Sequence, residues 1–409
     1  MKFDSKAKTV DLNPRDPEFY NDPYPYYEAI REECPAFFWN NYDMWCFAAF
    51  ADVNRLLRDK RFGRQILHVA TREELGMADP KPHLADFDAI EAHSLLELEP
   101  PAHTRLRTMV NRAFVSRQVE KLRPDIEALT HATIDLFADD GGVELIKTFA
   151  EPIPVSVIAR MLGVPQELNG ELLDWSHRMV RMYMFETDET TERDANRAAQ
   201  EFSACLTELI AARRKNPTDD LISHMVTSER KGDRLSDGEL ISTCVLLLNA
   251  GHEATVHQTG NAVKAILENR LDHRALFADA ASTEAAIEES LRYDAPLHLF
   301  TRYALQDVEL DNGIEIRKGE QIGLMLGAAN RDPAQFADAA SFVSGRPDQA
   351  NVTFGAGIHF CIGAPLARLE LQTSLPILFE RLPGLKLSDT PRYRDAYHFH
   401  GLERLDLSW

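Results

Sequence analysis

Apolar residues recur at helical spacing over most of the chain. This pattern predicts helices over 117–137, 151–162, 166–184, 190–215, 236–269, 282–293 and 363–381. The alternation typical of strands is confined to short pieces at 44–50, 303–310, 313–326 and 402–409. Asp311, Asn312 and Gly313 form a hairpin-turn signal between two of these pieces.

Strand-like pieces occur near both ends of the chain, so we expect them to share one small sheet. The sequence therefore predicts a mainly α protein with a minor β part (α+β), folded as a single domain over 1–409. Its helix-rich core spans about 100–300 and 363–381, and its β part comes from about 40–60 and 300–409. The segment 63–98 is polar and has no sustained period, which predicts a long loop.

The acidic composition limits the classes of partner. With 65 acidic and 45 basic side chains the formal charge is −20, which argues against general binding to nucleic acids or anionic membranes. The longest apolar run, 244–250, is too short to span a bilayer. The five cysteines are widely spaced and form no C-x-x-C, so we expect neither a disulfide framework nor a structural zinc site, and we expect a cytoplasmic location.

The segment TFGAGIHFCIGAPLARLELQ, at 353–372, places Cys361 among three glycines and directly before a helical pattern. A lone cysteine is ordinarily a small buried hydrophobe. Here the helix N-terminus and the glycines can direct backbone N–H groups at the sulfur, which stabilises a thiolate. Such a thiolate can act as a nucleophile with His359 as its base, or it can bind a metal whose other ligands come from a cofactor, as heme iron does.

The ten residues 354–363 match every fixed position of the motif F-G-x-G-x-H-x-C-x-G, which resembles the cysteine loop of the cytochrome P-450 heme-thiolate monooxygenases. The resemblance covers nearly the whole chain and is to the soluble bacterial members. It implies a prism-like, triangular single unit with a long central helix over the heme. It also implies heme b (iron protoporphyrin IX) with Cys361 as axial ligand, dioxygen as co-substrate, and heme contacts from Phe354, Gly355 and Gly363.

The same resemblance assigns roles to charged residues elsewhere in the chain. The heme propionates would be bound by His103, Arg107, Arg302 and His359. Glu289 and Arg292 lie three apart on one helix face and would pair with Arg346 behind the cysteine loop, in a structural role. On the helix face away from His103, Arg105 and Arg112 would form a basic patch where a ferredoxin-type electron donor docks.

The longest helical pattern begins with a capping box at Ser236 and carries Gly251 at its middle, which indicates close packing or a local distortion. In the resembled family this helix bears a small residue–Gly–x–acid–Thr motif over the heme. Ala250, Gly251 and Glu253 match it, but Ala254 takes the threonine position and Thr255 follows. Proton delivery to dioxygen would then use ordered water with Glu253, Thr255 after a helix distortion, or a hydroxyl of the substrate.

The implied reaction is hydroxylation of an apolar or amphipathic small molecule with electrons from a separate donor, because no G-x-G-x-x-G follows a strand. By the resemblance, apolar residues from several segments would line the substrate pocket, although each could equally be ordinary core. They are Leu95, Met182, Phe185, Leu247, Leu297, Leu299 and Phe399.

Three alternatives stay open at this stage. A heme-thiolate protein could be a peroxide-driven peroxygenase or a non-redox enzyme, for which Ala254 leaves room. A non-catalytic heme carrier is the second, and Glu253 argues against it because a carrier has no need of an acid over the iron. The third, a cysteine hydrolase, predicts no bound heme.

Overall fold

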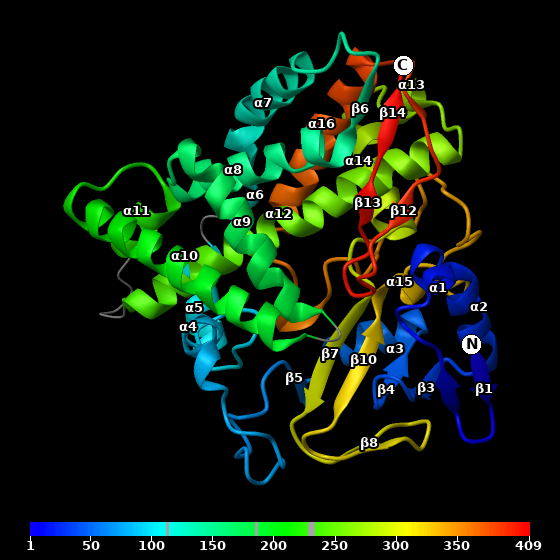
Figure 1. Ribbon diagram of the computed structural model, residues 1–409. Coiled ribbons are helices and arrows are strands. Elements are labelled where there is room, and N and C mark those ends of the chain that lie inside the picture. Colours follow the sequence, from blue (N-terminus) through cyan, green and yellow to red (C-terminus); the bar gives the residue numbers. More distant parts are fainter. Residues whose placement is uncertain (112–113, 185–186, 228–233) are drawn as a thin grey trace.

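The computed structural model describes residues 1–111, 114–184, 187–227 and 234–409. Figure 1 shows helices gathered on one side of the molecule and the larger sheet on the other, with α12 (Asp237–Glu268) crossing the middle. None of the helices in the described ranges could span a bilayer. The other α-helices there are α1 (Pro17–Asn21), α2 (Tyr24–Glu33), α3 (Phe50–Leu56), α4 (Ala85–Glu91), α5 (Ala102–Val110), α6 (Ser116–Val119), α7 (Arg123–Asp135), α8 (Pro152–Leu162), α9 (Asn169–Val180), α10 (Glu189–Lys215), α11 (Leu221–Thr227), α13 (His273–Leu276), α14 (Ala280–Tyr293), α15 (Leu326–Ala329) and α16 (Ala364–Arg381).

The central helix α12 matches its predicted range to within one residue at each end. Ser236 and Glu239 form the expected capping box at its start. Gly251 lies against α8, where an added Cβ would come within 3.3 Å of Ile158 Cγ1. The helix continues through this position without a break, so close packing rather than a distortion explains the glycine.

Seven strands form the larger sheet, in the order β1-β2-β3-β4-β10-β7-β5. Strand β4 pairs in parallel with β10, which places Cys46 opposite Gly323. Both ends of the chain therefore share this sheet, as the strand pattern predicts. The strands are β1 (Lys2–Asp4), β2 (Thr9–Asp11), β3 (Ala36–Trp39), β4 (Met44–Phe47), β5 (Phe62–Gly63), β7 (Leu299–Ala304) and β10 (Gln321–Met325).

The remaining strands form small separate sheets. The predicted turn at 311–313 joins β8 (Val308–Glu309) to β9 (Glu315–Ile316) as an antiparallel pair, with Gly313 at a φ of 76° that glycine adopts without strain. The C-terminal piece at 402–409 does not join the larger sheet, which corrects the sequence-based expectation. It forms β13 (Leu402–Arg404), paired with β12 (Arg392–Tyr393), and β14 (Asp406–Ser408), which lies between β11 (Lys386–Leu387) and β6 (Gly142–Glu144).

The segment 63–98 is not a continuous loop. It contains a 3-10 turn at Pro82–Leu84 and helix α4, whose Phe87 and Ile90 are buried in the helical core. The prediction of a long loop was wrong because two apolar positions in a short, acidic helix are too few to reveal a period.

A buried ion cluster connects α14 with the segment that precedes the cysteine loop. The Glu289 carboxylate accepts hydrogen bonds from Arg292 at 2.7 and 2.8 Å and from Arg346 at 3.0 Å. All three residues are at most 9% exposed. Arg292 also donates to the carbonyl oxygens of Asn330 and Ala339, so both charged groups and backbone acceptors are satisfied together.

The cluster extends to the cysteine loop through Asn330. The Asn330 side chain donates to the Thr353 hydroxyl at 2.8 Å and accepts from the Val352 N–H at 2.9 Å. The Thr353 hydroxyl in turn donates to the carbonyl of Leu291 on α14 at 2.7 Å. The start of the cysteine loop is thus fixed to the same helix that carries Glu289.

We expect Glu289→Gln to lower the free energy of unfolding by about 3 kcal/mol or more, because it leaves two buried guanidinium groups without a counter-ion. The control is Glu120→Gln, which removes a more exposed ion pair with Arg123 and should cost at most about 1 kcal/mol. Urea unfolding followed by circular dichroism compares the variants. Equal losses in the two would contradict the importance of the buried cluster.

Candidate active site

The cysteine loop depends on two glycines in left-handed backbone conformation. Gly355 and Gly357 have φ values of 68° and 72°, and a Cβ on Gly357 would lie 2.5 Å from the carbonyl oxygen of Leu57. The N–H of Cys361 donates to the carbonyl of Phe354 at 2.9 Å, which closes the loop just before α16 begins at Ala364. Larger residues at these glycines would displace the loop and the thiol that it carries.

The Cys361 thiol is accessible, yet protein surrounds it closely. The residue is exposed, whereas Cys34, Cys46 and Cys244 are buried. Desolvation raises the pKa of the Cys361 thiol, while the N–H groups of Gly363 and Ala364 and the charge of Arg107 act in the opposite direction. These N–H donors and the charge of Arg107 stabilise the negative charge of a thiolate at Cys361.

Two histidines from separate elements meet beside the loop. The rings of His103, on α5, and His359 have centroids 4.5 Å apart, and His359 Nε2 lies 3.2 Å from the Glu99 carboxylate. Desolvation, together with His359 and Arg107, lowers the pKa of His103 to about 4. His103 Nε2 is buried and has no hydrogen-bond partner among the described residues.

Two arginines add positive charge to the same region. Arg107 donates to the carbonyl of Phe360 at 2.6 Å. Arg302 is 4% exposed and donates to the carbonyl of Thr301 at 2.8 Å, but nothing in the described ranges gives it a carboxylate ion pair. Desolvation lowers the pKa of Arg302 to about 9. A buried cation and an unpartnered imidazole fit a ligand with anionic groups, as the two propionates of heme are.

In the middle of α12, at 250–254, the small residues are accessible and the larger ones are buried. Ala250 is exposed and Gly251 and Ala254 are partly exposed, while His252 and Glu253 between them are buried. Ala250 and Ala254 lie four apart on one face of the helix. The hydroxyl of Thr255 is turned back toward the carbonyl of Gly251 at 3.4 Å.

Glu253 lies among three histidines and one arginine. Its Oε1 is 3.2 Å from His257 Nε2 and 3.5 Å from Arg394, and its Oε2 is 3.5 Å from the Nε2 atoms of both His177 and His252. Desolvation alone would raise the pKa of Glu253, but the hydrogen bond with His257 and the charges of the histidines hold it well below its usual value. Glu253 is therefore a buried carboxylate that stays ionised.

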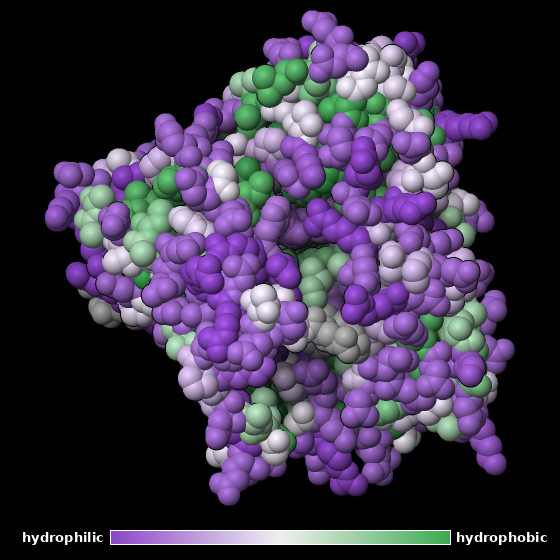
Figure 2. Space-filling model, in the orientation of Figure 1, coloured by the Kyte–Doolittle hydropathy of each residue, from purple (hydrophilic) through white to green (hydrophobic). Residues whose placement is uncertain are grey.

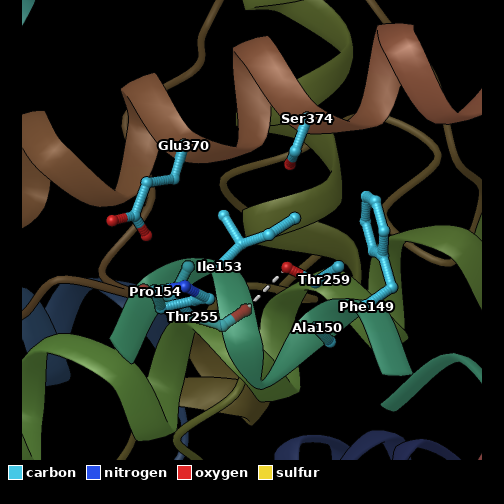
Figure 3. Close-up of a pocket in the computed structure, with 8 residues that line it drawn as sticks. All are labelled: Phe149, Ala150, Ile153, Pro154, Thr255, Thr259, Glu370 and Ser374. Carbon is cyan, nitrogen blue, oxygen red and sulfur yellow. Dashed lines mark hydrogen bonds between the residues drawn. The ribbon is translucent and has the colours of Figure 1, made fainter. Parts of the chain in front are cut away.

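A second buried carboxyl group, Glu370 on α16, lines a small pocket near α12. Figure 3 shows Glu370 and Ser374 directed from α16 toward the side chains of Ile153, Pro154 and their neighbours. The pocket is too narrow to hold a water molecule. Both Glu370 oxygens lack a partner in the described part of the chain, and burial raises the pKa of Glu370 to about 8.

The residues expected to line the substrate pocket differ in their burial and in the side chains that they pack against. Figure 2 shows a hollow on this face with apolar residues at its floor and a largely hydrophilic rim. Leu297 and Phe399 are partly buried and form a β-bridge, and Met182 is partly buried against the helical core, which includes Leu95 and Leu247.

Two of the expected pocket residues need separate comment. Phe185 lies outside the described residues. Leu299 belongs to a cluster with Tyr27 and Trp39, whereas the adjacent Phe300 packs against a different cluster, because successive strand residues point to opposite faces of the sheet. This corrects the expectation that Leu299 lines the pocket.

The expected basic patch is only partly described. Arg105 forms an ion pair with Glu239 at the start of α12 and donates to the carbonyl of Arg234 at 2.9 Å. Arg112 falls outside the described ranges. Beside Cys361, two apolar side chains of the loop are exposed, Ile358 at 44% and Phe360 at 39%.

Four residues of the site were not among the sequence-based candidates. His177 and Arg394 contact Glu253 from distant segments of the chain. No local sequence pattern could therefore predict these contacts. His257 lies four residues after Glu253 on the same helix, a spacing that the sequence does display. Glu370 lacked any signal, because a carboxyl group in a helix is normally on its solvent face.

Comparisons with known proteins agree on one family. The family model described as Cytochrome P-450 matches residues 65–388. Cytochrome P-450 107B1 of Saccharopolyspora erythraea is 37% identical over 405 residues, which cover 98% of each chain. Cytochrome P-450 monooxygenase PikC of Streptomyces venezuelae is 35% identical over 410 residues, covering 98% of this chain and 94% of that protein.

Solved structures agree with the sequence relatives. The crystal structure of P-450BioI in complex with hexadec-9Z-enoic acid ligated acyl carrier protein superposes with a TM-score of 0.88 at 32% identity. The match covers 96% of this chain and 100% of that one. These matches confirm the expected fold, a mainly α chain with small sheets.

We expect the buried Glu370 carboxyl to make stability depend on pH. Its raised pKa means that the folded chain keeps this proton between about pH 4.5 and 8, where the unfolded chain loses it. The unfolded state then binds fewer protons, so stability falls as the pH rises through this window. In Glu370→Gln this contribution disappears, so the Tm of the variant should gain several degrees on the wild type between about pH 5 and pH 8.

The control for this prediction is Glu380→Gln, an exposed position on the same helix. It should leave the pH dependence of Tm unchanged. A difference between wild type and Glu370→Gln that is constant over this pH range would contradict the raised pKa.

Proposed function

The chain belongs to the cytochrome P-450 family, and from that premise we propose that it is a heme-thiolate monooxygenase that hydroxylates an apolar or amphipathic small molecule. Relatives over nearly the whole length are named as a monooxygenase and as hydroxylases, so the chain is an oxidoreductase. The proposal rests above all on the Cys361 loop, where an accessible thiol lies under the backbone N–H groups that open α16.

In this proposal the sulfur of Cys361 would hold the iron of heme b. The N–H groups of Gly363 and Ala364 and the charge of Arg107 stabilise the negative sulfur. Gly355, at a φ of 68°, would let the backbone of the loop come close to a flat ligand. The guanidinium carbon of Arg368 lies over the ring of Phe354, 4.5 Å from the ring centre. The heme propionates would be held by His103, Arg107, Arg302 and His359.

Heme iron with a thiolate ligand supplies the activation of dioxygen. The chain supplies space for dioxygen along the accessible face of α12, on either side of Gly251, at Ala250 and Ala254, whose small side chains leave room. Glu289, Arg292 and Arg346 act at a distance, because their cluster holds the segment that leads into the cysteine loop.

Proton delivery is assigned to Glu253 with ordered water. Ala254 offers no hydroxyl, and the Thr255 hydroxyl is turned back onto its own helix, which has no break that would redirect it. The side chain of His177, whose Nε2 lies 3.5 Å from Glu253 Oε2, is 38% exposed and connects the buried carboxylate to solvent. A hydroxyl of the substrate is the alternative proton donor.

The proposed substrate pocket combines Leu95, Met182, Leu247, Leu297 and Phe399, with Phe185 as a further candidate. These side chains are apolar, which suits an apolar or amphipathic substrate. Relatives named as 6-deoxyerythronolide B hydroxylase and vitamin D(3) 25-hydroxylase, from Saccharopolyspora erythraea and Pseudonocardia autotrophica, match 95% of this chain. Their names support a multi-carbon substrate of limited polarity.

Residues 1–409 would form a single domain that works in the cytoplasm. A separate ferredoxin-type protein would supply its electrons. We propose the cysteine-loop face with Arg105 and Arg112 as its docking site. Ile358 and Phe360 offer exposed apolar area beside Cys361, and Arg107 adds charge against an acidic partner. The overall charge of −20 makes such a local basic region the preferred target for an acidic protein.

A peroxide-driven peroxygenase is the second candidate, favoured by Ala254 and the inward-turned Thr255 hydroxyl. A peroxygenase takes both oxygen and electrons from hydrogen peroxide and needs no donor protein. Turnover with hydrogen peroxide, compared with turnover supported by ferredoxin, its reductase and NAD(P)H, separates the two functions.

We expect the reduced protein with carbon monoxide to give the strongly red-shifted Soret band of a thiolate ligand, and Cys361→Ser to lose it. Serine cannot supply the polarisable thiolate that shifts the band. Cys205→Ser, on α10, is the control and should keep it. Absence of the band from wild-type protein reconstituted with heme would overturn both the assignment of Cys361 and the function.

We expect Glu253→Gln to reduce the product formed per dioxygen consumed by about tenfold or more, because an amide cannot pass a proton on. Glu268→Gln, at the end of the same helix in an ion pair with Lys264, is the control. Both variants should retain the Soret band. Unchanged coupling in Glu253→Gln would transfer proton delivery to the substrate or to another group.

A further inference from the structure

The two oxygens of Glu253 face different partners. Oε1 contacts His257 and Arg394, as described above. Oε2 instead faces the Nε2 atoms of His177 and His252, each at 3.5 Å. These three atoms lie within 4.8 Å of one another and come from α9 and α12. They form a nitrogen–nitrogen–oxygen set at the Glu253 oxygen other than the one that Arg394 contacts.

The orientation of His252 is set by its other nitrogen. His252 Nδ1 lies 2.9 Å from the carbonyl oxygen of Leu248, and a carbonyl can only accept, so Nδ1 carries a hydrogen. In the neutral ring Nε2 then presents a lone pair. His252 is fully buried, and this Nε2 has no hydrogen-bond partner in the described ranges. A buried lone pair directed at a carboxylate oxygen is unfavourable unless a proton or a metal cation lies between them.

We propose that His177, His252 and Glu253 bind a divalent transition-metal ion of the zinc class. Two imidazole nitrogens and one carboxylate oxygen are a common ligand set for such ions. In tetrahedral coordination, ligand atoms about 2.0–2.1 Å from zinc are about 3.4 Å from one another, which is close to the two distances of 3.5 Å.

The surroundings of the three ligands complete the site. The hydrogen bond from His252 Nδ1 to a backbone carbonyl is the kind of contact that orients a ligating histidine. His177 is 38% exposed, which gives the ion access and leaves a fourth position for water. Glu151 also lies within electrostatic reach of His177 and Glu253 and adds a second carboxyl group to the region.

Binding of the ion would join α9 to α12. Helix α9 leads directly into the segment with Met182, beside the proposed substrate pocket. The ion would therefore brace one wall of that pocket. It would also withdraw Glu253 from proton delivery, a consequence that rests on the proposed function, whereas the binding itself does not.

The test is calorimetric titration of Zn²⁺ into the purified, chelator-treated protein in a non-coordinating buffer. We expect one zinc per chain with micromolar or tighter affinity, retained after desalting. Zinc at about a hundredfold excess over its Kd should raise Tm by about 3 °C. His177→Gln should weaken zinc binding at least tenfold and abolish the rise in Tm.

His224→Gln is the matched control, because His224 is an exposed histidine 3.1 Å from a carboxylate, that of Asp219. This variant should bind zinc like the wild type. Binding that is unaffected by His177→Gln, or equally weakened by His224→Gln, would overturn the site, as would no binding at millimolar zinc. None of these readouts requires heme turnover, so failure of the metal site and failure of the monooxygenase proposal are distinguishable.

Discussion

The buried carboxylate of Glu289 is the constraint on which the active site depends. It gathers two guanidinium groups that would otherwise be isolated charges in the interior. Through Arg292 these charges hold the carbonyl of Asn330, and the side chain of Asn330 fixes the residues that open the cysteine loop. The thiol is therefore positioned from behind by an electrostatic anchor. The front of the loop stays available for a ligand, because none of the holding contacts passes through the sulfur.

Long periodic elements were predictable, and contacts between distant segments were not. The range of α12 follows from its apolar period and from the capping box at Ser236, two signals contained in a few consecutive residues. Cys361 was found through a motif of the same local kind. His177 and Arg394 were missed because only the folded chain brings them to Glu253, and Leu299 was misplaced because a strand's burial on either face looks the same in sequence.

Two buried carboxyl groups near α12 differ in protonation although both are glutamates. Glu253 faces histidines and an arginine and stays ionised, while Glu370 faces apolar side chains and keeps its proton up to about pH 8. Thr255, which lines the Glu370 pocket, lies about 200° around the helix from Glu253. The helix thus separates an ionised carboxylate from a protonated carboxyl group. Environments that push two pKa values apart in this way are what acid–base chemistry at neutral pH requires.

The parallel pairing of β4 with β10 has a consequence for the biogenesis of the chain. Trp45 and Phe47 face strand partners that lie 277 residues later, a length of chain that a ribosome synthesises in roughly 15–55 s. During that time the N-terminal strands have an unpaired edge, which invites association with other nascent chains. Production of this protein should therefore respond to translation speed and to chaperones that cover strand edges.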